Sequence, residues 1–216
     1  KSRHWAVWLP DFLAKFDYET LRYYLVANGS ETSDADFSWK EFATRINSEL
    51  IGTFGNFINR VLAFINKNFP EGVEFPEKLD ERSAEFIKLS EDSFALTSAA
   101  IEAGHFREAL RVVFKLVEEG NRYINDMAPW VSIKIDKQKA ASDLAVAAQV
   151  IKCLAILINP FLPQSSEKIY AQLGQNFSDI KWEKPEAGLL KVVSPEPIYK
   201  RIEDTQVVEQ ESLLGV

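Results

Sequence analysis

The stretch that most constrains the fold of this chain runs from residue 38 to residue 69. Its apolar side chains recur mostly at steps of three or four, which is the period of an amphipathic helix with one buried face. Ser38, or Asp36 before it, can cap the start of the helix, Glu41 completes the pattern of a capping box, and Pro70 ends the helix. The stripe predicts one long helix packed against other elements, and its members are Phe42, Ile46, Leu50, Phe54, Phe57, Ile58, Val61, Leu62, Ile65 and Phe69.

The same periodicity, bounded by capping residues and by glycine or proline, predicts further helices. They cover residues 18–28, a span from Asp80 or Ser83 to Ala103, residues 106–126, residues 140–158, and a short helix from Ser165 or Ser166 to Leu173. The piece at 140–158 is apolar on most of its circumference, which is typical of the central helix of a bundle. Strands do not alternate with helices anywhere, so we predict an all-α fold, a bundle of about five main helices.

The pattern weakens after residue 175. Residues 176–200 contain a tryptophan, a leucine pair and several prolines, and are expected to form an extended flap packed on the bundle. Residues 201–216 are acidic and short of core residues, so they are expected to be a helical or disordered linker toward a further domain. The first residue is not Met, which suggests a piece of a longer protein.

Charge and composition exclude several classes of function. The 216 residues carry a net charge of -7, with 13 acidic and 7 basic side chains between residues 71 and 130, which argues against general binding to phosphate backbones. No uninterrupted apolar run reaches the roughly 18 residues that span a bilayer, and the start lacks the apolar core of a secretory signal, so a cytoplasmic protein without membrane contact is expected. The single cysteine, Cys153, sits among apolar residues and is expected to be a buried thiol.

Motifs of catalysis and metal binding are missing from the sequence. The two histidines, His4 and His105, lie about a hundred residues apart without CxxC, HExxH or calcium-loop patterns beside them. No glycine-rich phosphate loop or nucleophile elbow occurs, and acidic clusters such as the one around Asp80 suit solvated helix faces. We therefore expect no catalytic residue, metal or cofactor in this chain itself.

Three residues suit the reading of unstacked bases. Asn56 and Arg60 lie four apart, so they share one face of the long helix, and both can make paired hydrogen bonds to base edges. Trp130 follows Ala128-Pro129 and offers a ring on which a base can stack, which contributes about 1 to 3 kcal/mol per base. Each residue taken singly is more often a surface polar group or a core side chain.

Several sequence pieces, in order, resemble the anticodon-binding region of the methionyl-tRNA synthetases, a family of class I aminoacyl-tRNA synthetases. The resemblance covers roughly residues 1 to 200. The matching pieces are Lys1-Ser2-Arg3, the LRYYL within residues 17–25, Asp36-Phe37-Ser38-Trp39, Asn47-Ser48-Glu49-Leu50, Gly55-Asn56-Phe57-Ile58-Asn59-Arg60, Asn121-Arg122-Tyr123-Ile124, Ala128-Pro129-Trp130, Asn159-Pro160-Phe161-Leu162-Pro163 and Ser165-Ser166-Glu167.

The resemblance implies a division of the chain. Residues 1–35 look like the end of the Lys-Met-Ser-Lys-Ser loop and a segment that contacts the tRNA stem, and residues 36–175 look like the anticodon-binding bundle. Lys1 would be the remnant of the loop that stabilises the ATP phosphates, although His4 stands where the family usually has glycine. ATP and Mg are then cofactors of the parent enzyme, not of this piece.

The resemblance also implies a role for named residues. Asn56, Arg60 and Trp130 match the residues that recognise a CAU anticodon, and Asn59, Asn121 and Lys134 are weaker supporting candidates. The expected partners are the anticodon loop of the methionine tRNA, the catalytic domain of the parent, and in some members an appended domain for tRNA binding and dimerisation.

Two alternatives remain open from the sequence. One is the anticodon-binding domain of a sister synthetase specific for leucine, isoleucine, valine or cysteine. The other is a helical interaction module without an RNA role, in which Trp130 belongs to the core.

Overall fold

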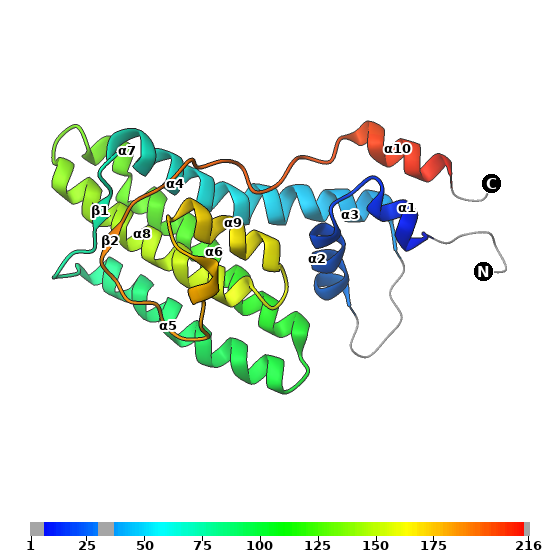
Figure 1. The fold of residues 1–216 in the computed structure, drawn as a ribbon, viewed down its shortest axis with the longest axis horizontal. Helices are drawn as coiled ribbons and strands as arrows, with labels where there is room; N and C mark the ends of the chain where they lie inside the picture. The colour runs from blue at the N-terminus through cyan, green and yellow to red at the C-terminus, as the bar shows by residue number, and fades with distance from the viewer. Residues whose placement is uncertain (1–6, 30–36, 214–216) are drawn as a thin grey trace.

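The computed structural model describes residues 7–29 and 37–213, and its architecture is the predicted all-α bundle (Figure 1). Lys1, His4 and Asp36 lie outside the described residues. The long bundle helices are α5 (Glu81–Glu102), α6 (Phe106–Met127) and α8 (Lys137–Ile158), and a long helical rod of three consecutive segments crosses them. The shorter helices are α1 (Leu9–Leu13), α2 (Tyr18–Asn28), α7 (Pro129–Ser132), α9 (Pro163–Gln172), the 3₁₀ turn η2 (Phe177–Asp179) and α10 (Asp204–Ser212).

The rod is the predicted long helix, but its middle is wider than an α-helix. It consists of α3 (Trp39–Arg45), the π-helix η1 (Ile46–Gly55) and α4 (Asn56–Asn68). Its buried stripe includes an unbroken series of four-residue steps, which in a pure α-helix would drift by about 40° per step around the axis. The i→i+5 turns of a π-helix are wider and take up this drift. All six members of that series are 0% exposed: Phe42, Ile46, Leu50, Phe54, Ile58 and Leu62.

Helix α8 forms the centre of the core, as its apolar circumference predicts. It packs against α5, α6, α7 and α9, and almost every residue from Leu144 to Ile158 is buried. Length and composition alone would let this helix cross a membrane, but 83% of the window concerned is buried inside the bundle. Burial among neighbouring helices therefore accounts for its hydrophobicity. The predicted buried thiol is confirmed, since Cys153 is 1% exposed.

Three of the predicted N-caps are confirmed. Asp17 accepts a hydrogen bond from the backbone of Glu19 at 2.7 Å, Ser38 accepts one from Glu41, and Asp80 is the residue that caps α5. The return half of the capping box at Ser38 is not among the described contacts, because the Glu41 carboxylate accepts from Asn28 and faces Arg45 instead.

The predicted cap of the last bundle helix is wrong. Helix α9 begins at Pro163, so Ser165 and Ser166 lie inside its first turn and are fully buried. The acceptor for the free N–H groups comes from another part of the chain. The Glu19 carboxylate of α2 accepts from the backbone of Gln164 at 2.6 Å and of Ser165 at 2.9 Å.

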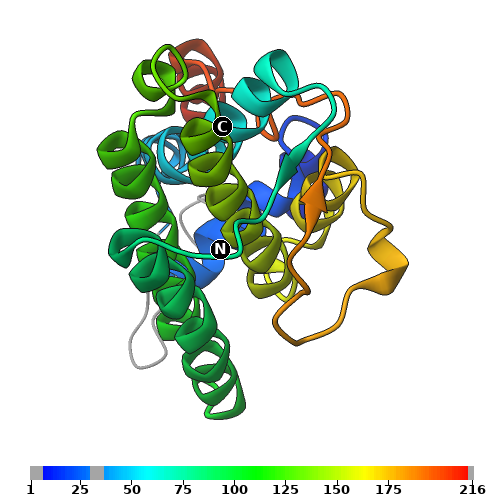
Figure 2. The same cartoon turned by 90° about the vertical axis from the view of Figure 1, so that its left-hand side faces the viewer.

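The flap expected over residues 176–200 lies along the bundle as a mostly extended chain. Its strand β2 (Leu189–Leu190) pairs antiparallel with β1 (Val73–Glu74), which lies in the loop predicted at 71–79, and both strands lie against α8 (Figure 2). Residues 191–203, here termed the C-terminal strap, continue across the rod. Three apolar strap residues are buried: Val192, Ile198 and Ile202.

Helix α10 follows the strap and packs on α3 (Figure 1), which is the helical alternative predicted for the C-terminal residues. Asn47 fixes the junction, because its side-chain amide donates to the carbonyl of Ile202 at 2.8 Å and accepts from the Ile202 N–H at 3.0 Å. Lys15 adds an exposed ion pair to Glu209 on α10.

Candidate nucleic-acid interface

Arg60 and Trp130 meet on the surface although seventy residues separate them in the chain. The Arg60 guanidinium carbon lies 5.0 Å from the centroid of the Trp130 ring, a cation–π contact. Arg60 Nη2 also donates to Asn125 Oδ1 at 2.9 Å. Trp130 is 38% exposed, so its indole is neither a core plug nor a fully free side chain.

A tight connection between α6 and α7 presents the indole. Helix α6 ends at Met127, and Ala128 then takes a left-handed conformation with φ 42°. Pro129 begins α7, where its fixed φ and missing N–H fit the first helical turn. The Ala128 carbonyl accepts from the backbone of Val131 at 2.8 Å and of Ser132 at 3.1 Å, which fixes the orientation of the turn that carries Trp130.

Asn56 and Asn59 occupy the first turn of α4. Asn56 is exposed and Asn59 is half-buried, and neither side-chain amide forms a hydrogen bond with any residue that the structure describes. Arg60 lies one turn beyond Asn56, about 6 Å along the helix axis. The two amides therefore have free donors and acceptors beside the Arg60 guanidinium.

A hollow of about 180 Å³ opens next to these two amides. Its helical wall consists of Ile51, Gly55, Asn56 and Asn59, and its other wall is formed by the strap residues Pro197, Ile198 and Tyr199.

The supporting candidates Asn121 and Lys134 differ in whether their side chains are free to contact RNA. Asn121 holds α6 and the rod together, because its amide donates to the Thr53 carbonyl of η1 at 3.0 Å and to the Val117 carbonyl of α6 at 3.3 Å. Its donors are thus engaged with the protein. Lys134 is exposed in the turn that follows α7, next in the chain to the segment that carries Trp130.

The charge around Arg60 favours an anionic ligand. Among the described residues, Arg60 pairs with no carboxylate. The acidic groups on the adjoining part of α6 are paired with two other arginines, since Arg82 contacts Glu119 at 2.6 Å and Asp126 at 3.2 Å, and Arg122 contacts Glu119 at 3.2 Å. Arg60 therefore keeps an uncompensated positive charge at the surface.

Sequence reasoning missed two parts of this face. Asn125 positions the Arg60 guanidinium, and its spacing of four residues from Asn121 on α6 was a usable signal. The strap residues 197–199 carry no such signal, because they lie about 140 residues beyond the helix they approach.

Helix α2 is attached to the bundle through partly buried polar contacts. Arg22 Nε donates to the Phe161 carbonyl at 2.8 Å, and the Tyr23 hydroxyl donates to the Glu49 carboxylate of η1. Burial raises the pKa of the Glu19 carboxyl, and hydrogen bonds from Ser165 and Gln164 offset part of that rise. The position of α2 relative to the rod and to α9 is thus fixed by several directional contacts.

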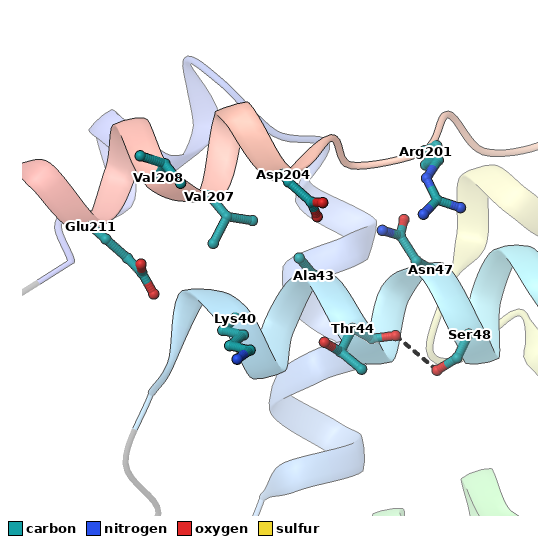
Figure 3. Close-up of a pocket in the computed structure, with 10 residues that line it drawn as sticks. All are labelled: Lys40, Ala43, Thr44, Asn47, Ser48, Arg201, Asp204, Val207, Val208 and Glu211. Atoms are coloured by element: carbon teal, nitrogen blue, oxygen red, sulfur yellow. Dashed lines mark hydrogen bonds between the residues drawn. The ribbon is translucent and has the colours of Figure 1, made fainter.

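A larger hollow lies elsewhere, between the rod and α10 (Figure 3), and measures about 580 Å³. Lys40, Thr44 and Ser48 line it from the rod, and Val207 and Glu211 approach from α10. None of the six predicted site residues faces it. Among the described residues, no group of three or more His, Cys, Asp or Glu side chains could hold a metal ion.

Comparisons with known proteins agree on one family. Residues 1–62 match the family model of the class I (M) tRNA synthetases, and residues 70–214 match the model of the anticodon-binding domain of methionyl-tRNA ligase. The chain is 40% identical to the methionine-tRNA ligase of Pyrococcus abyssi over 96% of its own length, and 40% identical to that of Dehalococcoides mccartyi over its whole length.

These two relatives are much longer proteins, because the chain spans only 29% and 40% of their lengths. The fold is also similar to that of the methionyl-tRNA synthetase of Mycobacterium tuberculosis in its apo form. That likeness has a TM-score of 0.82 and 23% identity, and it covers 91% of this chain and 41% of the solved one.

Proposed function

This chain belongs to the methionyl-tRNA synthetase family and carries its anticodon-binding domain, and we propose that it selects the methionine tRNA by reading a CAU anticodon with Asn56, Arg60 and Trp130. The observation that supports this proposal is the contact between Arg60 and Trp130, with Asn56 one helical turn away. In this proposal the stacking ring, the planar cation and the unpaired amide act together on one surface.

Each side chain has a separate task in this proposal. The Trp130 indole stacks on an unpaired base of the loop, which any base allows. The Arg60 guanidinium, with its fork of donors, reads a base edge that presents acceptors, and the Asn56 amide reads an edge with one donor and one acceptor. Base identity is therefore set by hydrogen bonds, and affinity largely by stacking and charge.

The parent reaction in this proposal is the joining of methionine to its tRNA, which is the reaction that the name of the longer relatives states, with ATP as the energy source. In that protein the part described here binds tRNA and contacts the catalytic domain, and it works in the cytoplasm with the rest of translation. ATP and Mg belong to the catalytic domain, and Lys1 would be the remnant of its phosphate loop.

We also propose a division of labour along the chain. Residues 1–35 contact the tRNA stem, and residues 36–175 bind the anticodon. Residues 176–200 brace the bundle, and residues 201–216 act as a linker. The contacts of α2 with Glu49 and Phe161 support this arrangement, because they attach α2 directly to the bundle.

The test compares anticodon stem-loops that differ only in the three anticodon bases. The chain should bind the CAU stem-loop more tightly than a scrambled one at the same salt concentration. Equal affinity for both RNAs would contradict the proposal. A preference for the anticodon of leucine, isoleucine, valine or cysteine tRNA would assign the chain to a different specificity, and no measurable RNA binding would favour an interaction module.

A further inference from the structure

We propose that the hollow between α4 and the C-terminal strap is a pocket for one unstacked nucleobase of the anticodon loop, read by Asn59 together with Asn56. This inference rests on the proposed function, because it assigns a binding place to a base of the same RNA. It gives the strap a part in RNA recognition in addition to its packing role.

The lining of the hollow suits a nucleobase better than a phosphate. The wall contains two free amides, aliphatic surface from Ile198 and one aromatic ring, and none of the lining side chains carries a charge. A phosphate would need a cation in this wall. A nucleobase instead needs apolar surface for its faces together with donors and acceptors for its edge, and two adjacent amides provide both kinds of polar group.

The size of the hollow also suits a single base. The hollow measures about 180 Å³, the room of roughly six water molecules at about 30 Å³ each. This space suits one planar ring system lying between the helix and the strap. A base that enters the hollow lies between the helix and the strap, which separates it from its neighbours in the loop.

The strap wall of the hollow is held in place by hydrogen bonds within the protein. Upstream, Gln172 Nε2 donates to the Glu196 carbonyl at 3.0 Å, and downstream Asn47 makes both of its hydrogen bonds to Ile202. Between them, the Tyr199 hydroxyl shares a hydrogen bond of 2.5 Å with Ser165 Oγ.

The Tyr199 ring itself borders the rod closely. A Cβ atom at Gly55 would lie 3.6 Å from Tyr199 Cδ2, and the Phe54 and Tyr199 ring centroids are 6.4 Å apart. A wall held at three points is preformed, which reduces the entropy lost when a ligand is bound.

The hollow also lies close to the other predicted RNA-binding residues. The two amides lie on the helical turn that leads into Arg60, and Arg60 contacts Trp130. A base stacked on Trp130 and a second base in the hollow would therefore flank the Arg60 guanidinium. Adjacent loop nucleotides, splayed apart, can span such a distance when the RNA is single-stranded.

The experiment measures the affinity of the full chain for four RNAs: the CAU stem-loop and three copies with an abasic ribose at one anticodon position. Asn59→Ala should weaken binding of the intact stem-loop by about 5- to 150-fold, which corresponds to the roughly 1 to 3 kcal/mol of a paired base contact. One abasic RNA should lose this difference, because the base that Asn59 contacts is missing from it.

Two further variants complete the design. Asn66→Ala, an exposed asparagine two turns further along α4, is the matched control and should bind all four RNAs as the unchanged chain does. Tyr199→Phe keeps the ring but releases it from Ser165, so it should lose less RNA affinity than Asn59→Ala. This loss should disappear with the same abasic RNA as the loss caused by Asn59→Ala.

The outcomes separate this inference from the proposed function. An Asn59→Ala loss that is equal for all four RNAs, or no loss at all, would overturn the pocket even if Trp130→Ala and Arg60→Ala weaken CAU binding. A Tyr199→Phe variant with unchanged affinity for every RNA would show that the strap does not contribute to the pocket. Failure of the proposed function would appear differently, as equal binding of CAU and scrambled stem-loops by the unchanged chain.

Discussion

The guanidinium of Arg60 lies over the indole of Trp130, 5.0 Å from the ring centroid, while its Nη2 donates to Asn125. The cation thus occupies one face of the ring on which a base would stack. A bound base must therefore use the remaining ring surface or take the place of the guanidinium. In either case Arg60 is held at the surface in a limited set of orientations before RNA arrives, which lowers the entropy lost on binding.

Replacement of the indole tests the stacking role. Trp130→Ala should weaken binding of a CAU stem-loop by about 1 to 3 kcal/mol, and Trp130→Phe by less, because a smaller ring still stacks. The helical circular dichroism of both variants should match that of the unchanged chain. RNA should quench tryptophan fluorescence, and the Trp130→Phe variant identifies the signal of this residue among the five tryptophans.

The arginine should act through its shape as well as its charge. Arg60→Lys keeps the charge but loses the planar fork, so we expect a loss of about 1 to 3 kcal/mol for the CAU stem-loop and little change for a scrambled one. Asn125→Ala should produce a smaller loss in the same direction by releasing the guanidinium. If Arg60→Lys weakens the binding of both RNAs equally, Arg60 contacts phosphate and not a base. Titrations at two salt concentrations provide the measurement.

Glu19 should matter for stability far more than its surface neighbours do. Glu19→Ala leaves the backbone N–H groups of Gln164 and Ser165 and the Ser165 hydroxyl without their acceptor, which costs about 1 to 3 kcal/mol for a buried group. Glu19→Gln keeps one acceptor oxygen and should lose less. Urea unfolding reports the free energy, and the exposed Glu209→Ala is the control, with an expected change within about 0.5 kcal/mol.

A glycine beneath the interface sets the distance between α6 and α4. A Cβ atom at Gly120 would lie 2.5 Å from Cζ of the buried Phe57 ring. Gly120→Ala gains about 1 kcal/mol of helix propensity, but overpacking in a rigid core costs typically 1 to 3 kcal/mol, so we expect net destabilisation. Gly188→Ala meets nothing within 4 Å and should change the melting temperature little. A Gly120→Ala variant as stable as the parent would mean that Phe57 moves freely.

Cys153 should react slowly in the folded protein. Burial raises the pKa of its thiol to about 11, so little thiolate forms at pH 8 and the side chain is also inaccessible. The unfolded chain ionises the thiol at a lower pH than the folded one. The folded state therefore keeps this proton up to a higher pH than the unfolded chain does. Its stability relative to the unfolded chain falls as pH rises from about 9 to 11.

Alkylation of the thiol at pH 8, with and without denaturant, checks the first statement. Urea unfolding of the parent and of Cys153→Ala between pH 8 and pH 10 checks the second. The difference in free energy of unfolding between the two proteins should shrink as pH rises, and a constant difference would contradict the assignment.

Local pattern determined much of this protein. The buried stripe of the rod, the caps at Asp17, Ser38 and Asp80, and the apolar circumference of α8 all follow from residues within about four positions of one another, and all are observed. Helical period and capping depend on such neighbours, so a sequence can predict them. The family was identified in the same way, from short ordered motifs.

Tertiary packing decided the rest. The cap of α9 is Glu19, some 145 residues away, and not the serines at the start of that helix; the hollow beside Asn59 exists only because the strap crosses the rod; and Arg60 meets Trp130 because α6 packs on the rod. Such contacts depend on the angles and distances at which whole helices pack, and these are set by many core side chains together. No pattern within a few residues contains that information, whereas the assembled core fixes it.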